Sequence, residues 1–119
     1  MDIRGANQSL LLDLMSAATL RARVLAGNLA NQNTPGYRRR EVLFEDKLLA
    51  EMRRSHPHLE RIQAEVRIDP DAEIRADGNT VSVEEEVSVG RQNRLTYELY
   101  ASILAGQNRL VNAAINMDR

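Results

Sequence analysis

The chain contains no cysteine and no tryptophan, and aromatic residues make up only 3% of its 119 residues. The absence of cysteine excludes disulfides and thiol chemistry, and it leaves the redox compartment open. A compact globule of this size usually takes more of its buried area from aromatic side chains. The apolar residues here are mostly Leu, Val, Ile and Ala. This composition favours long, closely packed helices over a thick core.

The sequence also lacks an excess of charge of one sign and lacks a long apolar run. Its 16 basic and 17 acidic residues give a net charge of −1, so nucleic acid is not expected as a partner. No apolar run reaches the ~18 residues that a membrane span needs. Leu10-Leu11-Leu12 is followed at once by Asp13, which leaves no apolar core for a cleaved secretory signal. This predicts a cytosolic chain, or one exported by a route that reads no such signal.

Apolar residues between Leu11 and Leu29 recur at alternating steps of four and three, which predicts a helix with a heptad seam. Ser9 is the predicted N-cap of this helix. The seam consists of Leu11, Met15, Ala18, Ala22, Leu25 and Leu29. Polar residues that fall away from the seam, and are therefore expected on the outer face, are Asp13, Arg21, Arg23 and Asn28.

A tight turn is predicted where Thr34-Pro35-Gly36-Tyr37 follows this helix. The residue before a proline avoids the helical region, so the helix should end near Asn33. Pro35 and Gly36 stand in the order that a type II turn requires. A helix C-terminus accounts for Asn33 and Asn31, because Asn tolerates the left-handed conformation there. It does not account for Asn28, whose amide we expect to bond to the backbone of a neighbouring subunit.

The middle of the chain predicts a small insert that is partly β and partly irregular. An extended stretch is expected over 37–44, and then a short helix over Glu45–Arg54 that ends before Pro57. Leu48, Leu49 and Met52 should share one side of that helix. Apolar residues alternate with polar ones over 62–68, which is the period of a half-buried strand. Turns are expected at 69–71 and at 77–79.

A second long helix is predicted from Ser82 onward, where Ser82 and Glu85 form a capping box. One apolar line with heptad spacing contains Val83, Val87, Gly90, Tyr97, Ala101, Leu104, Val111 and Ile115, with Arg94 and Asn108 as polar interruptions. A second line adds Tyr100, Ile103, Leu110, Ala114 and Met117. Two lines are more than one seam needs, so this helix should contact more than one neighbour. Its length is roughly 50 Å at 1.5 Å per residue.

These elements predict a mainly α fold, in which long N- and C-terminal helices pair as a coiled-coil-like, antiparallel hairpin around a short irregular or β insert. We expect one domain made of residues 1–36, 37–81 and 82–119. The excess apolar surface of the second helix requires partners outside the chain. Packing or subunit contacts are predicted for Leu11, Met15, Ala18, Ala22, Leu25, Asn28, Leu29, Asn31, Thr34, Pro35, Gly36, Tyr37, Val87, Tyr97, Tyr100, Ala101, Leu104, Val111 and Ile115.

None of the polar clusters predicts a catalytic, cofactor or metal site. His56-Pro57-His58 offers two histidines in a loop, whereas a zinc site needs three or four ligands. Arg38-Arg39-Arg40 is followed by acidic residues and has no interleaved aromatics, so it is either a solvated stretch or a contact with a neighbouring protein. Glu84-Glu85-Glu86 lies at a helix start, without a nearby His, Cys or Lys to complete an acid–base site. The sequence therefore argues against an enzyme.

Two segments resemble the bacterial flagellar basal-body rod proteins, and among these most closely the proximal rod subunit. The first contains Asn28-Leu29-Ala30-Asn31 and Thr34-Pro35-Gly36-Tyr37-Arg38. The second contains Asp77-Gly78-Asn79-Thr80-Val81-Ser82, the acidic helix start, and Gln92-Asn93-Arg94-Leu95-Thr96-Tyr97. One departure is Gln32, where the family more often has a small residue.

The resemblance implies a structural rod subunit whose terminal helices form the inner layer of a helical tube. Such a subunit would transmit torque and line the export channel of the basal body, in the periplasmic rod. It would be exported by the flagellar type III apparatus without a cleaved signal peptide. The implied partners are other rod subunits, further copies of the chain, the adaptor FliE, and the export gate and ring. The alternative is a small soluble helical adaptor or chaperone that binds one partner helix.

Overall fold

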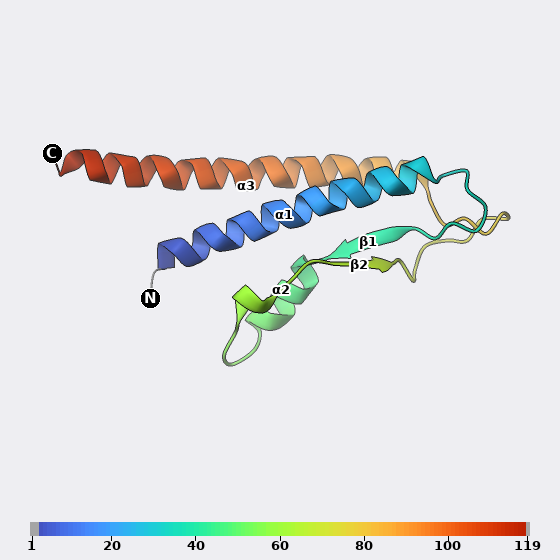
Figure 1. The fold of residues 1–119 in the computed structure, drawn as a ribbon, viewed down its shortest axis with the longest axis horizontal. Coiled ribbons are helices and arrows are strands. Elements are labelled where there is room, and N and C mark those ends of the chain that lie inside the picture. The colour runs from blue at the N-terminus through green and yellow to red at the C-terminus, as the bar shows by residue number, and fades with distance from the viewer. Residues whose placement is uncertain (1–2, 119) are drawn as a thin grey trace.

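The computed structural model describes residues 3–118 as an elongated helical hairpin of 67 × 32 × 14 Å. Its elements, in chain order, are α1 (Ile3–Ala30), β1 (Arg40–Leu43), α2 (Glu45–Met52), the 3₁₀ turn η1 (Leu59–Arg61), β2 (Glu65–Ile68) and α3 (Val83–Met117). Figure 1 shows α1 and α3 running antiparallel, with the strands and α2 on the side of α1 away from α3. The predicted mainly α hairpin with a small β insert is confirmed.

Helix α1 is longer at its start and shorter at its end than the sequence suggested. Ser9 lies inside the helix, so its prediction as N-cap is wrong; no proline precedes it to stop the helix from extending. The regular helix ends at Ala30, before the predicted Asn33. The Asn31 amide still donates to the Gly27 carbonyl (3.2 Å), and the Thr34 amide donates to the Asn31 carbonyl (3.1 Å), so the chain leaves the helix gradually.

Helix α1 packs on two sides. The seam residues Leu11, Ala18 and Leu25 are buried. A second apolar row places Ala17 against Phe44 and Leu48 and thereby holds α2 on α1. Partly buried apolar side chains complete this second cluster: Leu10, Leu14, Leu59, Ile62 and Ala64. The core of the molecule therefore lies on the α2 side of α1.

The two strands pair antiparallel, with Arg40 opposite Ile68 and Val42 opposite Val66. Val42 is buried, but every residue of β2 is exposed. The prediction of a strand within 62–68 is confirmed. The prediction that it is half-buried is wrong, because nothing among the described residues covers its outer face. Its earlier apolar residues, Ile62 and Ala64, are the ones that pack on the core.

Helix α2 exposes more apolar surface than expected. Leu48 is buried, whereas Leu49 and Met52 are more than half exposed. Consecutive helical residues are rotated by about 100°, so Leu48 and Leu49 point in different directions. The expectation that all three share one side is wrong for Leu48.

The turns predicted at 34–37 and at 77–79 are both present, as is the turn predicted at 69–71. The Tyr37 amide donates to the Thr34 carbonyl (3.2 Å), and Gly36 has φ +74°, as a type II turn requires. In the second turn, Gly78 has φ +83° and its amide donates to the Arg75 carbonyl (2.9 Å). Glycine adopts this left-handed conformation without the steric penalty that other residues meet.

Helix α3 begins at Val83, with the Ser82 hydroxyl accepting the Glu85 amide (3.4 Å), which confirms the Ser82 half of the predicted capping box. Within residues 3–118, the buried side chains of this helix are only Glu86 and Asn93, and both are polar. Its large apolar side chains are exposed along most of its length, up to Met117. The prediction of excess apolar surface on this helix is confirmed.

Candidate functional site

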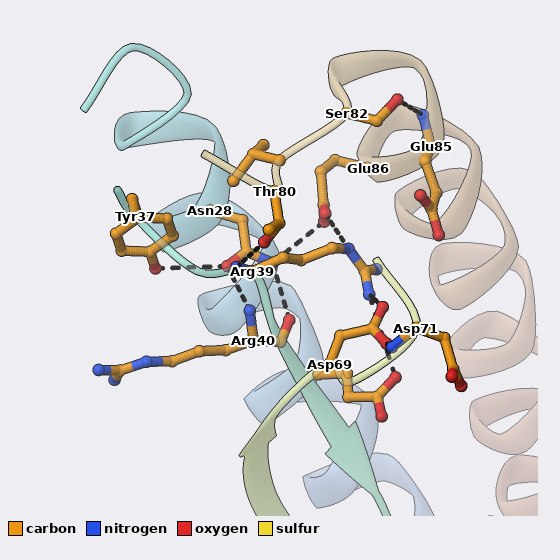
Figure 2. A network of polar contacts seen from close by, with 12 residues as sticks. Asn28, Tyr37, Arg39, Arg40, Asp69, Asp71, Thr80, Ser82, Glu85 and Glu86 are labelled. Atoms are coloured by element: carbon orange, nitrogen blue, oxygen red, sulfur yellow. Dashed lines mark hydrogen bonds and ion pairs between the residues drawn. The ribbon is translucent and has the colours of Figure 1, made fainter. Parts of the chain in front are cut away.

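Asn28, in the last turns of α1, is the centre of a hydrogen-bond network that joins three elements (Figure 2). Its Nδ2 donates to the Arg40 carbonyl (2.8 Å) and to Glu86 Oε2 (3.2 Å). Its Oδ1 accepts from the Arg40 amide (3.0 Å) and from the Tyr37 hydroxyl (3.3 Å). The side chain is fully buried. Asn28 therefore fastens the end of α1 to β1 and to the start of α3.

Arg39 and Glu86 form a buried ion pair beside Asn28. The Nε of Arg39 donates to Glu86 Oε1, and its Nη1 donates to Asp69 Oδ2 (2.8 Å). Burial by itself lowers the pKa of Arg39, but the hydrogen bond and charge of Glu86, with help from Asp69, outweigh it and raise that pKa above its ordinary value. Charges this deeply buried persist only when they are paired and hydrogen-bonded. We call Asn28, Tyr37, Arg39, Asp69 and Glu86 the polar anchor.

The turn that follows α1 and the turn that precedes α3 dock on each other next to the polar anchor. The Gly36 amide donates to the Asp77 carbonyl (3.0 Å), and the Thr80 amide donates to the Tyr37 carbonyl (3.0 Å). A Cβ atom on Gly78 would lie 3.4 Å from the Gly36 Cα, so the two backbones are in close contact. The two sequence segments that carry the family resemblance thus form a single structural unit.

Asn79 holds the segment that follows α1 through its backbone carbonyls. Its Nδ2 donates to the carbonyls of Asn31 (2.9 Å) and Thr34 (2.8 Å), and more weakly to that of Gln32 (3.3 Å). Its Oδ1 accepts the Val81 amide (2.7 Å). One fully buried asparagine from the opposite turn therefore fixes the path of the chain as it leaves α1.

A second polar contact fixes α3 against the middle of α1. Asn93 Nδ2 donates to the Ala18 carbonyl (2.9 Å), and its Oδ1 accepts from Arg21 Nη1 (3.2 Å). Arg21 also pairs with Glu45 (2.6 Å) at the start of α2 and donates to the Val42 carbonyl (3.4 Å). This contact sets the longitudinal position of the two long helices relative to each other.

An open groove of about 530 Å³ runs along the junction of α1 and α3. Small and apolar residues line much of it, including Ala22, Ala26, Val87, Gly90 and Tyr97. Elsewhere on the surface of α3, Leu95, Leu99 and Leu110 are more than half exposed. The hairpin is therefore fastened by polar contacts near its turn and leaves apolar surface uncovered along its length.

The predicted contact residues fall into three groups by exposure. Buried in the chain are Leu11, Ala18, Leu25 and Asn28. Half-buried are Met15, Leu29, Asn31, Tyr37, Tyr100, Ala101 and Leu104. Exposed, and so accessible to another subunit, are Ala22, Thr34, Pro35, Gly36, Val87, Tyr97, Val111 and Ile115.

Three predictions about polar residues need correction. Asn28 is fully buried and uses its donors and acceptors inside the chain, which leaves none for a neighbouring subunit. Arg21 and Asn28 were expected on an outer face, but both point into the molecule. Arg39 was grouped with Arg38 and Arg40 as solvated or intermolecular, and it is instead buried in the polar anchor.

Sequence reasoning also missed Glu86, Asn79 and Asn93 as structural residues. Glu86 was interpreted only as a charge at a helix start, where it lies beside two exposed glutamates. The signal that could have singled it out is its heptad step of seven residues from Asn93, which puts both polar side chains on the face that α3 turns toward α1.

The described residues show neither a metal cluster nor a membrane-spanning helix. Among residues 3–118, no group of three or more His, Cys, Asp or Glu side chains is placed to hold a metal ion. No helix within the same range combines the length and hydropathy needed to span a bilayer. What the arrangement of side chains does is mechanical: it joins two long helices at one end.

A helical hairpin with a polar anchor and uncovered apolar faces defines a structural subunit of an assembly. No family model matches the chain. It is 32% identical over 105 residues to the flagellar basal body rod protein FlgB of Escherichia coli (strain K12), covering 73% of this chain and 76% of that protein. It is 31% identical over 100 residues to FlgB of Aquifex aeolicus (80% and 81%), and 29% identical over 123 residues to FlgB of Borrelia hermsii (87% and 89%).

The chain belongs to the FlgB family of flagellar basal body rod proteins. Its function is that of a structural subunit of the rod. The small adaptor, which was the alternative from the sequence, is favoured by none of these findings.

Proposed function

We propose that the chain assembles helically with other rod subunits and with its own copies, transmits torque and lines the export channel. The observation that carries this proposal is the surface of α3: among the described residues its buried side chains are only Glu86 and Asn93. Leu95, Leu110 and Met117 are about two thirds exposed or more. Burial of these side chains against neighbouring subunits would be favourable by about 25 cal/mol per Å² of apolar surface.

The assembly that we propose is open, and it is built from contacts between unlike surfaces of successive subunits. A contact between two different surfaces forms a helix when its rotation does not close. The polar anchor fixes the angle between α1 and α3 at the turn, so that each copy presents the same surfaces to its neighbours. Helical order along the rod then follows from repetition of one hairpin geometry.

Export and partners are part of the same proposal. The chain is exported by the flagellar type III apparatus without a cleaved signal peptide and lies in the periplasmic rod. It contacts the adaptor FliE and the export gate and ring, and it performs no catalysis. The resemblance of its two motif segments to rod proteins supports these statements, and the absence of a catalytic constellation among the described residues is compatible with them.

The test places a charge on the uncovered surface. Leu110 is 73% exposed and lies outside the buried core of the hairpin, so Leu110→Asp should change the unfolding midpoint of the isolated chain little. In cells it should abolish rod assembly and swimming, because a carboxylate would be buried without a partner. Asn112→Asp, on the same exposed stretch of α3, is the matched control. Normal swimming with Leu110→Asp would overturn the proposal.

A further inference from the structure

A second groove lies where residues 73–75 pass the first turn of α3, away from the helix junction. It holds about 550 Å³ and combines exposed apolar side chains with carboxylates. Ile74 is 64% exposed and Val83 is 42% exposed. Glu73, Glu84 and Glu85 line the same groove. We call these five residues the acidic groove.

Among the described residues, Glu73, Glu84 and Glu85 form no ion pair, in contrast to the buried Glu86. The charge of Glu85 acts on the buried Arg39 without a direct contact, so Glu73 and Glu84 are the carboxylates most available to a cation from outside the chain. Arg75 also lines the groove, but its guanidinium is already engaged by the Gln32 carbonyl (2.5 Å) and by Asp77 (3.3 Å). The groove therefore offers negative charge beside apolar surface.

The end of α2 carries the complementary features. Leu49, Met52 and Arg53 are spaced i, i+3 and i+4, which puts them on one face of the helix. Leu49 and Met52 are 53% and 55% exposed. Arg53 is exposed and forms no ion pair within the described part of the chain, and its neighbour Arg54 is exposed beside it. We call Leu49, Met52 and Arg53 the α2 knob.

We infer that the α2 knob of one copy docks in the acidic groove of a second copy of this chain. Two apolar side chains would meet Ile74 and Val83, while Arg53 would meet the unpaired carboxylates. Charge complementarity of this kind fixes partner and register. This inference rests on the proposed function, since it specifies one contact within the rod.

The placement of the two surfaces makes the contact repeat. Figure 1 shows α2 at one end of the two strands and the start of α3 toward their other end, so a single chain does not fill its own groove. Each copy would give a knob to one neighbour and receive a knob from another. Such a contact joins unlike surfaces and therefore propagates along an open assembly.

Cysteine cross-linking tests the contact directly, because the chain contains no cysteine of its own. Full-length chains carrying Met52→Cys are mixed with chains carrying Ile74→Cys and exposed to a mild oxidant. We expect disulfide-linked dimers. Their yield should clearly exceed the yield from a control mixture in which chains carrying the exposed Gln63→Cys replace those carrying Met52→Cys. A chain carrying both cysteines should form a ladder of multimers. Equal yields in the two mixtures would overturn the inference.

A charge exchange identifies the partner. In one experiment both chains of the cross-linking pair carry Arg53→Glu, and in another both carry Glu84→Arg. Each change should lower the dimer yield about tenfold, because like charges would then face each other across the contact. Arg53→Glu on the knob chain combined with Glu84→Arg on the groove chain should restore it. Arg109→Glu, an exposed reversal far from both surfaces, is the control. Failure of the exchange to restore the dimer would overturn the inference.

Basal bodies separate this inference from the proposed function. Cells that carry the two-cysteine chain are scored for swimming and for the presence of the chain in isolated basal bodies, which tests the proposed function alone. Cross-linking of those basal bodies then tests the contact. Incorporated chains that yield no multimers, or that cross-link at these cysteines only to a protein of another mass, would overturn the second-copy contact and leave the rod function intact.

Discussion

At the scale of single residues, the ion pair of Arg39 and Glu86 is the most consequential contact. Removing one member of a buried pair leaves the other charged and unpaired, which typically costs about 3–5 kcal/mol. Glu86→Ala should therefore strongly lower the free energy of unfolding, measured by circular dichroism in urea. Glu98→Ala removes an exposed i,i+4 partner of Arg94 and should cost no more than about 0.5 kcal/mol. Similar costs for the two variants would contradict the importance of the polar anchor.

Gly36 gives a second prediction at this scale. Its φ of +74° strains any β-branched residue, although no atom within 4 Å would clash with an added Cβ. Gly36→Val should destabilise the chain by about 1–2 kcal/mol or more, from conformation alone. Gly27→Ala, inside α1 and also in open space, should be neutral or stabilising by up to about 1 kcal/mol. Urea unfolding measures the stability of both variants. If Gly36→Val is as stable as the unaltered chain, then this position does not require the left-handed conformation.

The residues whose roles could be predicted act locally, and those that could not act at long range. The Pro35-Gly36 turn and the Ser82 cap follow from neighbours within three residues. Arg39 and Glu86 are separated by 47 residues, and Asn28 and Glu86 by 58, so no local pattern joins them. A buried charge also looks like a surface charge in a sequence until its partner is placed.

At the scale of elements, the junction of α1 and α3 depends on side-chain size. Ala18 is almost fully buried there and its carbonyl accepts from Asn93, so Ala18→Leu should push the helices apart and cost about 1–3 kcal/mol. Ala22, one turn further on, is exposed in the open groove. Ala22→Leu should therefore cost little in the isolated chain.

Thermal unfolding of the two alanine variants measures this difference. The larger fall in midpoint should belong to Ala18→Leu. If Ala22→Leu is equally destabilising, then the groove is closed in solution and the helices pack more tightly than the structure indicates.

The hairpin was predictable because heptad spacing persists in both long helices. The second face of α1 was missed because Leu10, Leu14 and Ala17 form a row of their own, which overlaps the seam in sequence. Apolar periodicity shows that a face is buried without showing what covers it. For the same reason, β2 was correctly predicted as a strand while its burial was not.

At the scale of the whole molecule, stability should be uneven along its length. The polar anchor, the docked turns and Asn93 all lie in the half nearer the turn, whereas α3 beyond Leu99 contains no buried side chain among the described residues. Amide hydrogen exchange of the isolated chain should be slow near the anchor and fast in the last turns of α3, because uncovered helices open readily. The same amides should become protected in assembled rods.

A second measurement would contradict this picture. If the dilute monomer, verified by sedimentation, shows uniform protection over the whole of α3, then the helix is stable without neighbours. The surface of α3 would then be an ordinary solvated face, and the argument for assembly through it would fail.

The start of α1 and the end of α3 lie at the same end of the hairpin, opposite the turn (Figure 1). A force that pulls these two helix ends apart acts across the helix pair, so the contacts between α1 and α3 break one after another. Twisting of a stack of such hairpins instead loads many contacts side by side in shear, and these must fail together. The same pair of helices therefore unfolds easily when a single chain is pulled from one terminus. Once many hairpins are packed together, it resists rotation.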